Sequence, residues 1–287
     1  MAARFQYGLG WVRQLPDLRD FDLEHPQVKA LLKGTSVAKV AAEAAGKPPD
    51  RVDDLRGMCS PVEDQRSLGA CTAHAAVGLI EFFENKAFGK FVDASRLFVY
   101  KASRNMLHWT GDTGAYLRTA MKTLVMLGAP PEEYWPYDLD RFDEEPPAFC
   151  YSLAAAFKAV KYFRVDQPGQ SPSERLQSIK QLLAARQPLM FGFTVYNSID
   201  TCGQTGRIPP PTPADKVVGG HAVLAVGYDD ALEIGKRKGA LCIRNSWGEG
   251  WGEKGYGWLP YDYVTQELAD DFWTVQSQEW VDTGQFA

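Results

Sequence analysis

The sequence predicts an α+β protein with a helical first half and a second half built mainly from strands. Apolar segments with helix-capping signals lie before residue 130, whereas short runs rich in Val, Ile and aromatic residues dominate after residue 188. The two kinds of segment are not interleaved, which argues against repeating β-α-β units. We therefore expect two lobes of different composition.

The predicted helices are apolar stretches bounded by a cap or a helix breaker. Ser95 is placed to cap one of them, and Gly128 with the following Pro pair closes another. The sequence Ser-Pro-Ser-Glu at 171–174 fits a capping box with Pro at the first helical position. The predicted ranges are 27–46, 71–88, 95–106, 115–127 and 171–186.

The predicted strands cover 189–195, 221–228, 240–246 and 256–259, with weak strand character at 5–11. The tract GKPPD at 46–50 is a turn and the best candidate boundary. We expect an N-terminal extension at 1–50 and a main domain at 51–287. Its helical lobe should cover about 51–150 and its strand-rich lobe about 151–287.

Composition excludes several functional classes. The 31 basic and 36 acidic residues give a net charge of −5 and form no basic stripe, so we expect no nucleic-acid partner. No segment approaches the roughly 18 apolar residues that span a bilayer, so we expect no membrane partner. The N-terminal residues contain no continuous apolar h-region of a Sec signal. We expect a cytoplasmic protein or one exported by a non-Sec route.

Cysteine usage argues against a metal centre. The chain has only four histidines and no CxxC pair, so we expect no metal and no other cofactor. Reduced thiols are the simplest expectation without a secretion signal, although pairing of the cysteines other than Cys71 stays open. The five cysteines are Cys59, Cys71, Cys150, Cys202 and Cys242.

Residues 61–74, PVEDQRSLGACTAH, place a nucleophile candidate at the start of a predicted helix. The positive end of the helix dipole at Cys71 favours the thiolate. The backbone N–H of Cys71 and the side-chain amide of Gln65 would form an oxyanion hole. A cysteine at the start of a buried helix is also an ordinary core residue, so this segment alone does not decide the function.

Two later segments complete a catalytic pattern. His221 opens a buried strand within GGHAVLAVGY, and Asn245 ends a strand within IRNSWGEGWGEKGY. His221 follows Cys71 by 150 residues, which is the order and separation of a papain-type Cys-His-Asn arrangement.

With these segments the chain resembles the papain family of cysteine peptidases from about Arg51 to the C-terminus. The strings DLR at 54–56, NSWGEGWGEKGY at 245–256 and EYWPY at 133–137 carry the resemblance, and LGACTA with GGHAV is similar to the bacterial branch. The resemblance implies a two-lobed papain-like fold. A helical lobe and a β-barrel-like lobe would then flank an active-site cleft.

The resemblance also implies a mechanism. Cys71 would be a thiolate held against the His221 imidazolium, Asn245 would orient the imidazole, and Gln65 would bind the oxyanion. Trp247 would shield the Asn–His bond, and Trp251 would line the primed side of the cleft. The segment 111–114, with Gly111 and Gly114, resembles the glycine wall that pairs with an extended peptide or protein substrate.

Several positions depart from the family pattern. Thr72 replaces a Trp, Arg66 replaces a Gly beside the oxyanion Gln, and Gly220 replaces an Asp before the histidine. Leu68 and the GDTG segment replace two cysteines, so that family disulfide cannot form. Arg66 either crowds the oxyanion hole or points to solvent.

Alternatives remain from the sequence. One alternative is a catalytically silent papain-like binding protein, and another is a thiol amidase or transferase acting on non-peptide amides. His74, one helical turn after Cys71, is a weaker candidate base. His108 is a weaker candidate for substrate contact.

The N-terminal 50 residues are too rich in large apolar groups for a solvated tail. One hypothesis is that part of this extension crosses or flanks the cleft as an autoinhibitory strand. The other is that it packs away from the cleft and stabilises the fold only.

Overall fold

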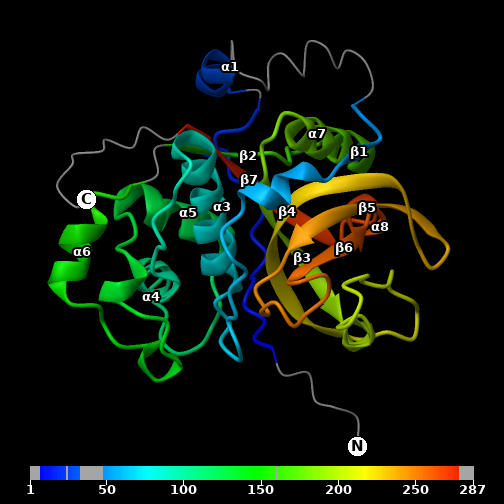
Figure 1. Cartoon of the computed structure of the whole chain (residues 1–287). Helices are drawn as coiled ribbons and strands as arrows, with labels where there is room; N and C mark the ends of the chain where they lie inside the picture. Colours follow the sequence, from blue (N-terminus) through cyan, green and yellow to red (C-terminus); the bar gives the residue numbers. More distant parts are fainter. Residues whose placement is uncertain (1–6, 24, 33–47, 159–160, 278–287) are drawn as a thin grey trace, which may run out of the picture.

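A group of helices and a large antiparallel sheet lie side by side (Figure 1). The computed structural model describes residues 7–23, 25–32, 48–158 and 161–277. Its mixture of helices and antiparallel strands confirms the predicted α+β class.

The helical part is built around α3 (Cys71–Phe88), whose first fourteen residues are all buried. Next to it lie α4 (Arg96–Met106), α5 (Leu117–Met126) and α6 (Ala148–Ala154). The predicted bounds of α3 are confirmed, and Ser95 caps α4 by accepting a hydrogen bond from the Phe98 N–H. The helix predicted at 27–46 begins as α1 (Pro26–Leu32), but 33–47 lie outside the described residues.

The sheet has seven strands in the order β2-β7-β3-β4-β5-β6, with β1 paired to β4. No pairing joins β6 to β2 in the described part of the chain, so the barrel-like lobe is an open sheet. The strands are β1 (Arg51–Val52), β2 (Lys161–Arg164), β3 (Leu189–Tyr196), β4 (Val217–Ile234), β5 (Arg237–Arg244), β6 (Tyr256–Pro260) and β7 (Ala269–Ser277).

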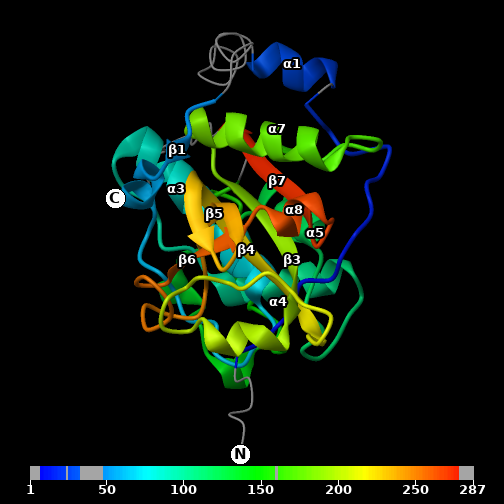
Figure 2. The same ribbon diagram turned by 90° about the vertical axis from the view of Figure 1, so that its right-hand side faces the viewer.

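Two short helices complete the strand-rich side. The helix α7 (Pro172–Ala184) packs near β4 and carries the predicted capping box at Ser171 (Figure 2). A one-turn helix, α8 (Asp262–Thr265), lies between β6 and β7. None of the helices that the structure describes is long and apolar enough to cross a membrane.

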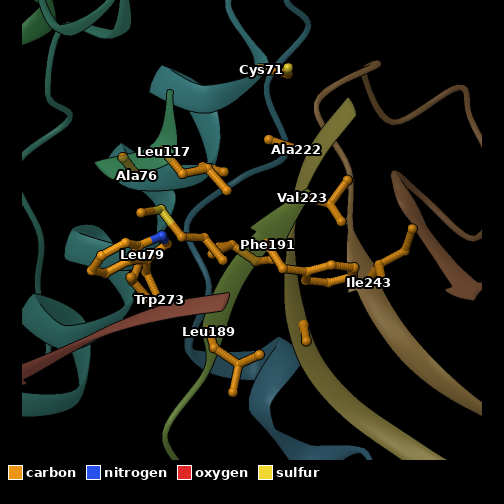
Figure 3. Close-up of a cluster of buried hydrophobic side chains, with 14 of the residues drawn as sticks. Cys71, Ala76, Leu79, Leu117, Leu189, Phe191, Ala222, Val223, Ile243 and Trp273 are labelled. Carbon is orange, nitrogen blue, oxygen red and sulfur yellow. The ribbon is translucent and has the colours of Figure 1, made fainter. Parts of the chain in front are cut away.

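An apolar core joins the helices to the sheet. Leu79 from α3 and Leu117 from α5 face Phe191 of β3 and Val223 of β4 (Figure 3). Cys71 lies at one end of this cluster, where α3 begins. The core therefore holds the start of α3 next to the part of β4 that contains Ala222, so residues from the helices and from the sheet lie close together there.

Residues 7–12 run between the helices and the sheet, in the dark blue trace of Figure 1. The Trp11 N–H donates to the Gly220 carbonyl at 3.1 Å, on the sheet side. On the helical side, the Ala115 N–H donates to the Gly10 carbonyl at 2.9 Å. We call residues 7–12 the cleft segment, because it hydrogen-bonds to both sides of the molecule.

Candidate active site

Cys71 begins α3 immediately after a tight turn. The Gln65 N–H donates to the Ser246 carbonyl at 2.9 Å, and this bond ties the turn to the strand-rich side. The Cys71 side chain is fully buried, and the backbone N–H groups of Ala222 and Gly10 face its sulfur. The thiol therefore lies between α3, β4 and the cleft segment.

His221 lies in β4, and Asn245 is the residue that follows the neighbouring strand β5. The imidazole Nε2 and the Asn245 Oδ1 are 2.7 Å apart, and this oxygen also accepts the Ser246 N–H at 2.8 Å. A carbonyl oxygen can only accept, so Nε2 carries the proton. Within the described residues Nδ1 has no hydrogen-bond partner, which leaves it available as a base.

Two tryptophans cover this pair. Trp247 stacks on the His221 ring with 4.4 Å between centroids, and Trp251 meets Trp247 edge to face at 5.4 Å. Both indoles are buried. Their position agrees with a role for Trp247 in shielding the His221–Asn245 bond from water.

Gln65 is buried and held in one orientation. Its Oε1 accepts the Ser246 hydroxyl proton at 2.5 Å, and its Nε2 donates to the Leu68 carbonyl at 2.7 Å. The same Nε2 donates to the Gly8 carbonyl at 2.9 Å. Sequence reasoning missed Ser246 as the residue that orients Gln65. Its place in the NSW string next to Asn245 was the available signal.

Burial favours the uncharged forms of both groups. It raises the pKa of the Cys71 thiol to about 11, although backbone N–H groups oppose the shift. Burial lowers the pKa of His221 to about 4, although the hydrogen bond that Nε2–H donates to Asn245 opposes the shift. The thiolate–imidazolium pair expected from the sequence is therefore not the favoured form while the cleft segment is in place, because burial penalises both charges.

The predicted glycine wall lies partly against the cleft segment. A Cβ on Gly114 would lie 2.2 Å from the Gly10 carbonyl oxygen, so the two backbones are in direct contact. A Cβ on Gly111 would meet no atom within 4 Å, so the space on that side of Gly111 is open. Asp112, which lies between them, accepts the Gly69 N–H at 2.9 Å and connects the wall to the turn before Cys71.

The other end of the cleft segment reaches the tryptophans. Tyr7 stacks on Trp247 with 4.8 Å between ring centroids and 11° between planes. The Gly8 N–H donates to the Arg66 carbonyl at 2.9 Å. The segment therefore contacts the turn before Cys71, the thiol and Trp247.

The remaining predicted positions have simple environments. Arg66 is exposed and has a positive φ of 53°, so its side chain does not crowd Gln65. His74 is buried and meets Tyr137 edge to face, behind the site. His108 is exposed in a shallow depression beside Val12. In the described residues all five cysteines are free, and no cluster of three His, Cys, Asp or Glu side chains could hold a metal.

Comparison with known proteins decides the family. A family model described as papain family cysteine protease matches residues 48–271. The chain belongs to this family. It is therefore a cysteine-type peptidase, and the resemblance found in the sequence is confirmed.

Relatives of the family match nearly the whole chain. An uncharacterized peptidase C1-like protein of Acanthamoeba polyphaga mimivirus is 34% identical over 279 residues, which cover 93% of this chain and 86% of that protein. The crystal structure of xylellain, a cysteine protease from Xylella fastidiosa, is 33% identical with a TM-score of 0.75 and covers 97% of this chain and 100% of that one. The papain-like fold is thereby confirmed.

A more distant structure shows the same fold. Digestive procathepsin L2 of Tenebrio molitor is 21% identical with a TM-score of 0.66, and the match covers 94% of this chain and 78% of that one.

Proposed function

We propose that this peptidase cleaves peptide bonds with Cys71 as nucleophile, His221 as general base and acid, and Asn245 as the residue that orients the imidazole. The observation that carries the proposal is the 2.7 Å contact between His221 Nε2 and Asn245 Oδ1, which directs Nδ1 away from Asn245. Cys71 is the first residue of the buried helix α3, and the backbone N–H of Ala222, the residue after His221, faces its sulfur.

The reaction follows from these positions. His221 Nδ1 takes the proton of the Cys71 thiol, and the sulfur attacks the substrate carbonyl carbon. Nδ1 then passes this proton to the leaving amine as the C–N bond breaks. Water attacks the acyl-enzyme and gives a proton to Nδ1, which returns it to the sulfur as the C–S bond breaks and the acid product leaves. Throughout the reaction Nε2 keeps its own proton, which it donates in the hydrogen bond to Asn245 Oδ1.

The side-chain amide of Gln65 is placed to stabilise the oxyanion that forms on the substrate carbonyl. Its Nε2 already donates to a backbone carbonyl oxygen, that of Gly8, beside the start of α3. A substrate carbonyl bound there would develop negative charge during attack, and the fixed amide would stabilise it more than the neutral carbonyl. Ser246 contributes by holding the amide in place.

We further propose that the cleft segment is an autoinhibitor. It meets Ala115 in a parallel bridge at Trp11, and its glycines pass close to the turn. A Cβ on Gly10 would lie 1.7 Å from the Gly69 carbonyl oxygen, and one on Gly8 would lie 2.1 Å from the Leu68 oxygen. A peptide substrate needs the same backbone donors and the same space, so the two exclude one another.

Ion pairs beyond the cleft hold the segment in place. Arg13 Nε donates a 2.8 Å hydrogen bond to Asp270 Oδ2, and Arg13 Nη2 lies 2.6 Å from the same oxygen. Arg118 donates to both carboxylate oxygens of Asp20, at 2.7 and 2.6 Å, and this pair is largely buried. The anchors come from both sides of the molecule, which favours one docked position.

Covalent capture in a full-length released variant tests both proposals. The released variant carries Gly10→Val, which cannot fit beside Gly69, and Trp11→Ala. An epoxide-type cysteine peptidase inhibitor should label it at Cys71, as located by mass spectrometry, and should label the wild type far more slowly. Labelling at another cysteine, or none in a folded released variant, would contradict the assignment.

A further inference from the structure

Trp11 fills a slot in the wall of the cleft. Its side chain is 8% exposed, and its backbone N–H is bound by Gly220, the residue before His221. Its neighbour Gly10 has its N–H at the Cys71 sulfur. The slot therefore holds the side chain of Trp11, and Gly10, the preceding residue, lies at the thiol.

Two glycines leave the room for the indole. A Cβ on Gly192 of β3 would lie 1.9 Å from Trp11 Cε2, so the ring rests directly on the strand backbone. A Cβ on Gly220 would lie 2.8 Å from Trp11 Cε3. Neither glycine has a positive φ, so the backbone conformation does not require glycine at either position. The space for a large flat ring is the clearest consequence of their missing side chains.

A buried carboxylate closes the slot. Asp271 is 0% exposed, and its Oδ2 accepts the Trp11 Nε1 proton at 3.3 Å. The other oxygen, Oδ1, accepts from Trp273 Nε1 at 2.7 Å and lies 3.2 Å from Arg164 Nη1. When the cleft segment leaves, Oδ2 loses this donor, and a buried acceptor without a donor is unfavourable.

We propose that this slot, once vacated, is the side-chain pocket that selects the substrate, and that it takes tryptophan. The inference rests on the proposed function of the site and names its substrate class. Gly192 sets the size of the accepted side chain, and Asp271 sets the preference for a ring with an N–H donor. Phenylalanine fills the slot but leaves Oδ2 without a donor.

The Asp271 carboxylate at the base of the slot already has a cation beside it, Arg164, which also lies near Asp20 and Asp270. Arg164 lies 3.2 Å from Asp271 and 2.6 Å from Asp166, so the carboxylate at the base has a resident cation. An incoming arginine would bring a second guanidinium next to Arg164. An indole donates one hydrogen bond without adding charge.

The test uses peptides that end in a thiol-reactive group, with one varied residue placed last or next to last before that group. The second-order rate of Cys71 labelling is measured by mass spectrometry in the full-length released variant, so no turnover is needed. We expect the tryptophan peptide of one series to react about tenfold faster than its phenylalanine counterpart, the size of effect expected from one hydrogen bond to a charged group.

Three further substitutions, one of them a control, are added separately to the released variant. Gly192→Ala should slow the tryptophan peptide by at least about tenfold, because its Cβ overlaps the ring, while a valine peptide should change by less than about threefold. Gly57→Ala is the matched control, since a Cβ there meets no atom within 4 Å. Asp271→Asn should lower the ratio of tryptophan to phenylalanine rates towards one.

The outcomes separate this inference from the proposed function. Labelling of Cys71 with equal rates for all peptides, or a faster reaction with arginine than with tryptophan, would overturn the tryptophan pocket and leave the peptidase assignment intact. A Gly192→Ala variant that slows every peptide equally would also overturn it. Thermal unfolding checks each variant, and if Asp271→Asn does not fold, the Gly192→Ala result decides alone.

Discussion

The side-chain amide of Gln65 donates a 2.9 Å hydrogen bond to the backbone carbonyl of Gly8, so the chain's own N-terminal segment occupies the donor proposed for the substrate oxyanion. The same segment places the Gly10 N–H at the Cys71 sulfur. The protein therefore carries its proposed catalytic residues and their competitor in one chain.

Cys71→Ala in the released variant should reduce peptide hydrolysis to trace level, because no other group forms the acyl-enzyme. The free energy of unfolding should fall by about 1 kcal/mol or less, since only one sulfur atom is removed. Turnover and urea unfolding are measured on the same preparation. Substantial turnover by the alanine variant would show that another residue is the nucleophile.

Gln65→Ala in the released variant should lower kcat by about 10²-fold, because one of two oxyanion donors is lost. Ser246→Ala should lower kcat by roughly fivefold, since it removes one hydrogen bond that orients the amide. Steady-state kinetics on a small peptide measures both. The oxyanion role is wrong if Gln65→Ala changes KM alone.

The ionisation of Cys71 should depend on the cleft segment. Burial penalises the charged thiolate and raises its pKa to about 11, so the wild type at pH 7 should hold a neutral thiol. The released variant admits water and should hold the thiolate at pH 7. Ultraviolet difference spectra against the matching Cys71→Ala variants report thiolate directly, and equal thiolate signals at pH 7 would refute this expectation.

Arg13→Ala should loosen the cleft segment by removing its ion pair with Asp270. The Arg13 side chain is 52% exposed, so the gain in kcat/KM should be only about two- to fivefold. Arg19→Ala is the matched control, because the Arg19 side chain is 87% exposed and pairs with Asp17 of the same stretch. A similar gain in kcat/KM in both variants would show that the Arg13–Asp270 ion pair does not anchor the cleft segment.

Much of the site was predictable because its local signals coincide with its geometry. The helix start at Cys71 and the cap at Ser95 are confirmed. Strands occur where predicted around His221 and before Asn245, but β4 begins at Val217 rather than at His221, and β5 ends at Arg244, one residue before Asn245. In each case a cap, a glycine or an apolar run within a few residues determines the element, so distant parts of the chain add little.

The parts that escaped prediction depend on distant contacts. Strand β7 begins with Ala-Asp-Asp, and its two acidic residues pair with cations that are distant in the sequence, Arg13 and Arg164. The slot for Trp11 is formed by Gly192 and Asp271, which lie far from Trp11 in the sequence. No local pattern indicates such a pocket, and the path of the N-terminal residues stayed open for the same reason.

The most direct test of the account compares kcat/KM on one small peptide substrate between the wild type and the released variant. Leu18→Ala, at a fully exposed position of the same stretch, is the control. Because kcat/KM scales with the fraction of molecules whose cleft is open, we expect a rise of at least about tenfold in the released variant and no change in the control. A folded released variant with the kcat/KM of the wild type would contradict the claim that the cleft segment blocks the active site.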